Sequence, residues 1–218
     1  MKKLLGIVLI AFITANYSMA GSVTIKVSSD ADAQIYVNGV LAASGSATIK
    51  VEKNATVNVK VKKPAFITQE RNYKNDGVMK LPKSEFIALQ KDLSYESSST
   101  TDLANHDVDI KTDKTEEEAF RKLSTIITAT FDVIEVTDKS TGYIRTAWAV
   151  KKFGPITIRT RLVIKLGSDS PLSYKVKIIS ERSETATSAR EDEKFEVWDR
   201  LLRVYDNVIP EMQSRLSK

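Results

Sequence analysis

The chain has 218 residues, of which 42% are hydrophobic, and its formal net charge at pH 7 is +5. This length is enough for two modest domains or one large one. The sequence contains no cysteine, which excludes disulfide bonds, thiolate metal sites and a thiol-linked lipid anchor. The charge excess is too small for a dedicated nucleic-acid-binding protein, so we expect no nucleic-acid partner.

The first twenty residues have the organisation of an export signal. Lys2 and Lys3 precede an apolar run over residues 4–13, and Ser18 and Ala20 place small side chains at the −3 and −1 positions. Signal peptidase recognises this pattern, and the run is shorter than the roughly 20 residues that span a bilayer. We expect a cleaved signal peptide, a periplasmic or secreted protein, and no transmembrane anchor after cleavage. An uncleaved N-terminal anchor is the alternative.

Residues 21–91 are predicted to form a small antiparallel β-sandwich. Val23, Ile25 and Val27 alternate with polar residues, as in a half-buried strand, and the same period recurs over residues 57–61. The pair Asn38-Gly39 favours a type I′ turn and therefore a hairpin. Short strands separated by turns at this spacing are typical of a sandwich.

This first domain also resembles a known module. Residues 27–39, which include Asp30-Ala31-Asp32-Ala33 and end at Asn38-Gly39, resemble the opening of a PEGA domain, and residues 46–51 and 57–63 resemble its continuation. The resemblance covers residues 23–70. It implies a small accessory β domain of a cell-envelope protein, with no catalytic residues.

Residues 92–106 are rich in serine and threonine and poor in apolar residues, which predicts a linker. The one histidine of the chain, His106, lies within it. A Ser-His-Asp site needs an imidazole on a rigid scaffold, so a linker histidine is a poor catalytic candidate.

Residues 107–218 are predicted to form an α+β domain in the order strand, helix, four strands, helix. Thr115 and Glu118 fit a capping box at the start of the first helix. Apolar residues recur at helical spacing from Phe195 to Leu216, which predicts one long final helix. Pro210 lies inside it, so we expect a kink or restart near Asn207. The predicted strands cover residues 107–111, 131–136, 143–150, 156–166 and 172–179. The predicted fold class is thus a β-sandwich followed by a four- to five-stranded antiparallel sheet with two helices on one face.

By topology alone, this second domain resembles TATA-binding-protein-like folds and is similar to helix-grip domains of envelope proteins. Period-two alternation assigns the two faces of its sheet. Ile144, Trp148 and Val150 are predicted to point to the helices, together with the even-numbered apolar residues of the next two strands. The opposite face is predicted to expose six cations: Arg145, Arg159, Arg161, Lys165, Lys175 and Lys177.

Because arginine pairs with carboxylate and phosphate oxygens in a planar, bidentate way, we interpret these six cations as a binding face. Its expected partner is an envelope protein, an anionic glycan or a lipid headgroup. A solvated face balanced by nearby acids is the competing interpretation.

The expected function is that of a non-enzymatic envelope accessory protein. An alternative is a binder of a small lipophilic ligand, held between the last helix and the sheet. Its pocket would be lined by four aromatic residues: Trp148, Tyr174, Trp198 and Tyr205. A glycan hydrolase is a third, weaker alternative. No spacing typical of a catalytic, metal or cofactor site occurs in the sequence, so we predict no cofactor and no metal.

Overall fold

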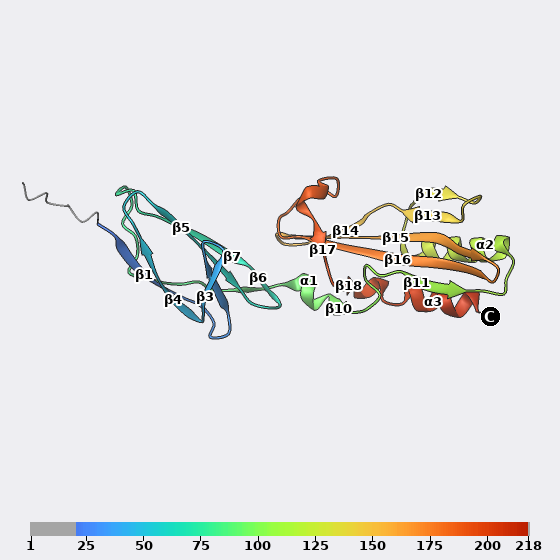
Figure 1. The fold of residues 1–218 in the computed structure, drawn as a ribbon, viewed down its shortest axis with the longest axis horizontal. Coiled ribbons are helices and arrows are strands. Elements are labelled where there is room, and N and C mark those ends of the chain that lie inside the picture. Colours follow the sequence, from blue (N-terminus) through green and yellow to red (C-terminus); the bar gives the residue numbers. More distant parts are fainter. Residues whose placement is uncertain (1–20, 218) are drawn as a thin grey trace, which may run out of the picture. The chain divides into compact units, whose positions relative to one another are not determined.

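The computed structural model describes residues 21–217 (Figure 1). The predicted signal peptide, residues 1–20, lies outside the described residues. The chain divides into two compact units. Unit 1 comprises the described residues up to Val61 together with Gln69–Ala88, and unit 2 comprises Lys62–Thr68 and the chain from Leu89 onward. The predicted combination of a β-rich part with an α+β part is confirmed.

Unit 1 contains two sheets. One has the strand order β4(Ser46–Val51), β1(Val23–Ser28), β8(Ser84–Phe86). The other has the order β3(Val40–Ser44), β2(Gln34–Val37), β5(Thr56–Lys62), β7(Gln69–Lys74). The pairing of β1 with β8 is parallel, whereas β1 pairs with β4 in antiparallel orientation. Asn38 and Gly39 have φ angles of 50° and 84° and join β2 to β3, which confirms the predicted hairpin turn.

Both sheets of unit 1 bury alternate side chains. Ile25 and Val27 of β1 are fully buried, and Val59 and Val61 of β5 are as well. This one-sided burial is the pattern of two sheets packed face to face, and it follows directly from the period-two alternation in the sequence.

Unit 2 is built on a seven-stranded sheet. Its main path is β11(Val108–Lys111), β16(Leu172–Ser183), β15(Ile156–Asp169), β13(Tyr143–Thr146), β12(Ile134–Asp138). In addition, β14(Ala149–Phe153) pairs with β15, and β17(Glu196–Val197) pairs with β16. The long hairpin of β15 and β16 is the centre of the sheet, because every other strand except β12 pairs with one of these two.

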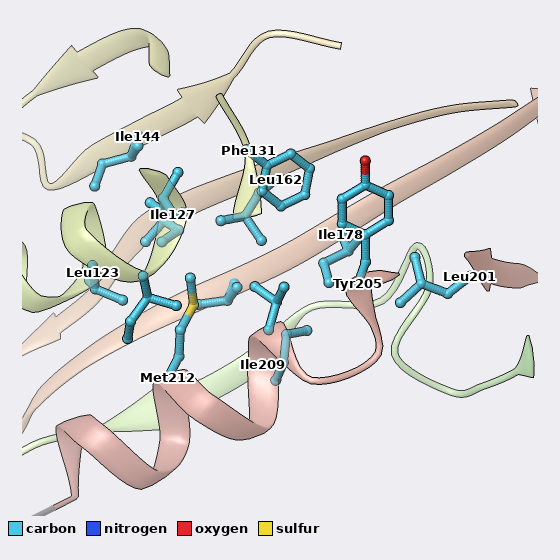
Figure 2. Close-up of a cluster of buried hydrophobic side chains, with 14 of the residues drawn as sticks. Leu123, Ile127, Phe131, Ile144, Leu162, Ile178, Leu201, Tyr205, Ile209 and Met212 are labelled. Atoms are coloured by element: carbon cyan, nitrogen blue, oxygen red, sulfur yellow. The ribbon is translucent and has the colours of Figure 1, made fainter. Parts of the chain in front are cut away.

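Two helices cover one face of this sheet. The first, α2(Glu116–Thr130), begins with the predicted capping box between Thr115 and Glu118. The second, α3(Val208–Leu216), packs beside it. Figure 2 shows Leu123 and Ile127 of α2 pointing at Ile209 and Met212, which belong to α3. Within residues 21–217, no helix is both long enough and apolar enough to cross a bilayer.

The predicted long final helix is wrong over its first half. Residues 195–207 contain β17, β18(Arg200–Leu202) and a short 3₁₀ turn over Arg203–Tyr205, and α3 begins only at Val208. The Trp198 N–H donates to the Ser180 carbonyl at 2.9 Å, and β18 pairs with β10(Ser98–Thr100). These long-range hydrogen bonds outweigh a helical periodicity in the sequence.

The predicted linker at residues 92–106 is also wrong, because this segment is an ordered part of unit 2. It contains the short helix α1(Leu93–Glu96) and β10, and Ala104 lies in the core. Just before it, β9(Gln90–Lys91) pairs with β6(Phe66–Ile67). The serines that suggested a linker are bonded inside the unit: Ser99 Oγ lies 2.8 Å from the Asp206 carboxylate.

Candidate functional site

The six predicted cations lie on the sheet face that the helices leave open. Leu162 and Ile164 of β15 are fully buried on the helix side, so Arg161 and Lys165 point the other way. The register carries this face across the neighbouring strands, since Arg145 lies opposite Val163 and Lys165 lies opposite Lys175. We call these six residues the cationic face; its members are Arg145, Arg159, Arg161, Lys165, Lys175 and Lys177.

Acidic neighbours neutralise three members of the cationic face. Arg145 Nε and Nη2 each lie 3.1 Å from one oxygen of Glu135. Lys177 Nζ lies 3.1 Å from the Asp107 carboxylate. Arg159, the third member, pairs with Glu181 and Asp192. For these three of the six cations, the structure therefore agrees with the competing interpretation, in which nearby acids balance the positive charge.

Arg159 is the most enclosed of the six, with its side chain 4% exposed. Its Nε and Nη2 donate to Glu181 at 2.6 and 2.5 Å, and its Nη1 lies 2.5 Å from Asp192. The Trp148 and Phe195 rings lie 4.2 and 4.0 Å from its guanidinium carbon. This arginine is therefore a structural residue, which fixes the segment that contains Asp192 and Phe195 against the sheet.

Arg161 has a different environment. Its guanidinium carbon lies 4.0 Å from the Trp148 ring centroid, and the side chain is partly buried. Its Nε is buried and has no hydrogen-bond acceptor, and no carboxylate of the described chain forms an ion pair with it. Burial, and after it the nearby Arg145 charge, lower the pKa of Arg161 below its ordinary value. The charges of Glu181 and Glu135 oppose this shift, but neither carboxylate forms an ion pair with Arg161. A partly desolvated cation with no carboxylate in direct contact is a position where a bound anion would be stabilised.

Lys165 and Lys175 complete the unpaired part of the face. They lie directly opposite each other on β15 and β16, and both are exposed. Neither forms an ion pair with any residue between 21 and 217. Three cations on the two central strands, Arg161, Lys165 and Lys175, are therefore available to an external anion, and we call them the open cations.

Trp148 lies on the cationic face, not under the helices as predicted. The reason is a one-residue shift between β13 and β14. Between the pairs Arg145–Val163 and Val150–Arg159, the chain of β13 and β14 advances five residues while β15 advances four. Such an irregularity turns every later side chain to the other face. Val150, also predicted to point to the helices, accordingly lies opposite Arg159 and is 43% exposed.

The four aromatic residues of the alternative ligand pocket do not come together. Trp148 is on the cationic face, whereas Tyr174, Trp198 and Tyr205 belong to the core between the sheet and the helices. Tyr205 stacks on Phe131 with ring centroids 4.8 Å apart. Figure 2 shows apolar side chains from the sheet and both helices converging around these two rings.

A surface concavity of about 850 Å³ lies elsewhere, at a place that no pattern in the sequence indicated. It is bordered by the outer side of α2, including Phe120 and Arg121, and by Lys139 of the β12–β13 turn. Lys139 Nζ lies 5.8 Å from the Phe120 ring centroid.

His106 is exposed, and the described residues contain no cluster of three metal-ligating side chains.

Comparisons with known proteins do not extend this description. No protein-family model matches the chain, and no curated protein matches its sequence.

Proposed function

We propose that this protein is a non-enzymatic accessory protein of the cell envelope, exported by its N-terminal signal, which binds an anionic envelope component through the cationic face of unit 2. Unit 1 would then be a PEGA-like accessory module. The observation that carries the proposal is Arg161: a partly buried guanidinium, stacked on Trp148, whose Nε has no acceptor within the described chain. Leaving such a donor unsatisfied costs free energy that a bound carboxylate or phosphate would recover.

The geometry around Arg161 favours the binding of an anion over catalysis. Arg161 lies against the Trp148 ring and near the charges of Arg145 and Arg159, and the nearby carboxylates, Glu181 and Glu135, are already paired with those two arginines. The lipophilic-ligand alternative has less support, because three of its four proposed pocket residues are packed in the core and the fourth lies across the sheet.

The first test is the binding of a short anion. Digalacturonate is titrated into the purified protein, and the indole N–H signal of Trp148 is followed by NMR, since this ring touches Arg161. We expect a saturable shift of that signal in the wild-type protein. Arg161→Gln should weaken binding by about tenfold or more, equivalent to ~1.4 kcal/mol.

The matched control is Arg121→Gln, which removes the same charge from α2 on the other side of the sheet. It should leave digalacturonate binding unchanged. The trisaccharide of neutral galactose, at the same concentrations, should not shift the Trp148 signal. Equal binding by wild type and Arg161→Gln would refute the proposed site.

A further inference from the structure

The open cations are arranged along the strands. Arg161 and Lys165 are on the same face of β15 and four residues apart, which corresponds to about 13 Å at 3.3 Å per residue. Lys175 lies beside Lys165 on β16. A monovalent ligand at Arg161 does not reach the two lysines, whereas an extended chain with several negative groups contacts both ends.

The lysine pair places two like charges side by side on neighbouring strands. Like charges directly opposite each other in an antiparallel pair repel and destabilise the sheet. Lys165 and Lys175 lie directly opposite each other in this way. No acid of the described chain forms an ion pair with either lysine. A negative group between them would remove this repulsion.

Acidic residues border the open cations on both sides. Glu135 belongs to the edge strand β12, and Asp107 and Asp109 belong to the β11 side, where Asp109 lies opposite Lys175. A broad anionic surface such as a membrane would meet these carboxylates. A narrow polymer that follows the strand direction passes between them, so the charge pattern favours a linear ligand over a lipid surface.

The neighbouring arginines indicate the type of anionic group. Arg145 and Arg159 each bind a carboxylate oxygen through Nε and Nη2. Glu135, Glu181 and Asp192 together balance the formal charges of Arg145, Arg159 and Arg161, so this end of the face carries no excess positive charge. Arg161 still has a buried Nε without an acceptor, and a singly charged carboxylate can accept from it while adding less negative charge than a doubly charged phosphomonoester.

We infer that the ligand of the cationic face is a linear acidic polysaccharide whose carboxylates lie along β15, from Arg161 at one end to Lys165 and Lys175 at the other. This inference rests on the proposed function and assigns its ligand class.

The test compares a short and a long oligomer of the same sugar. Digalacturonate reaches Arg161 alone, and octagalacturonate is long enough to contact all three open cations. In the wild-type protein, octagalacturonate should bind at least tenfold more tightly than digalacturonate, measured by calorimetry or by the Trp148 signal. Lys165→Gln/Lys175→Gln should abolish most of that gain and leave digalacturonate binding unchanged.

Controls separate this inference from the proposed function. Arg121→Gln/Lys122→Gln removes two charges from α2 and should not alter the preference for the long oligomer. If digalacturonate does not bind at Trp148, the proposed function fails. If it binds but the long oligomer shows no gain, or a gain that survives in Lys165→Gln/Lys175→Gln, this inference alone is overturned.

Two further probes examine the ligand class. Vesicles of anionic phospholipid should bind more weakly than octagalacturonate, because the flanking acids oppose a broad negative surface. A phosphodiester polymer of matched charge should also bind more weakly. Tighter binding of either probe would overturn the assignment to a carboxylated polysaccharide.

Discussion

Arg182 and Asp92 form a buried ion pair, with Nη2 2.7 Å from Oδ2, although they lie far apart in the sequence. Asp92 is fully buried, and its other oxygen accepts the Ser94 N–H at 2.8 Å at the start of α1. One carboxylate thus both caps α1 and joins it to the end of β16. This relationship explains why a segment with the composition of a linker is ordered.

The variant Asp92→Asn should therefore destabilise unit 2. Asparagine retains an acceptor for the helix cap but leaves the Arg182 charge buried without a counter-ion, which typically costs about 3–5 kcal/mol. Denaturant unfolding followed by tryptophan fluorescence measures the loss, because both tryptophans, Trp148 and Trp198, lie in unit 2. The control Asp102→Asn changes an exposed residue of the same segment and should stay within about 0.5 kcal/mol of wild type. Equal stabilities for the two variants would contradict the structural role of the pair.

The two central arginines of the cationic face should behave in opposite ways. Arg159→Gln leaves Glu181 and Asp192 without their cation and should cost about 3 kcal/mol or more in the free energy of unfolding. Arg161→Gln removes a buried donor that has no acceptor, so the stability should change by less than about 1 kcal/mol. Arg161→Gln should therefore lose anion binding but keep its stability. Loss of both properties in this variant would show that Arg161 is structural too.

Local patterns in the sequence predicted much of unit 2. The alternation of apolar residues placed Ile158, Leu162 and Ile164 on the buried side of β15, where they lie, and Thr115 correctly marked the start of α2. These features depend on neighbours within a few residues, so the sequence alone contains the information needed. The same alternation placed the six cations together on the opposite face.

Features that depend on distant partners were not predictable in this way. The position of Trp148 depends on a single extra residue between β13 and β14, which no local pattern reveals. The spacing of Trp198 and Tyr205 is helical, but their segment forms hydrogen bonds with β10 and with Ser180. These partners are far away in the sequence, so the local pattern does not indicate them. The neutralisation of Arg159 by Asp192 likewise depends on a chain reversal, so the sequence did not distinguish Arg159 from Arg161.

The segment that carries Asp192 contains a carboxylate with a strongly shifted pKa. Hydrogen bonds from Lys194, from the Thr187 hydroxyl and from the Ser188 N–H lower the pKa of Glu191 from 4.5 to about 2. Because the folded pKa is depressed, the stabilisation from these bonds is fully present above pH 4.5 and is lost as the pH falls towards 2.

NMR titration of the Glu191 carboxyl carbon should accordingly show a midpoint near 2, and the Ser188 amide, which donates to this carboxylate at 3.0 Å, should titrate with the same midpoint. In Glu191→Gln the titration of the Ser188 amide should disappear. A midpoint near 4.5 in the folded protein would show that these hydrogen bonds do not form in solution.

In unit 1, burial raises the pKa of Tyr73 above its usual range, and the hydrogen bond of its hydroxyl to Glu85, at 2.8 Å, raises it further. The phenol therefore stays protonated in the folded unit at a pH where it ionises in the unfolded chain. A raised folded pKa contributes stability that is fully present below pH 10 and is lost as the pH rises above it. Thermal unfolding of unit 1, followed by tyrosine circular dichroism, should thus shift to lower temperature above pH 10.

The variant Tyr73→Phe tests this dependence directly. At pH 7 it removes a hydrogen bond to a charged group and should cost about 1.5–3 kcal/mol. Above pH 10 the difference from wild type should shrink, because the wild-type protein then loses the contribution that the variant lacks throughout. Tyr36→Phe is the matched control. The Tyr36 hydroxyl donates to the neighbouring Gln34 side chain at 2.9 Å, and this variant should retain the wild-type fall in stability above pH 10. A constant difference between wild type and Tyr73→Phe from pH 7 to 11 would show that the Tyr73 phenol does not carry the alkaline sensitivity of unit 1.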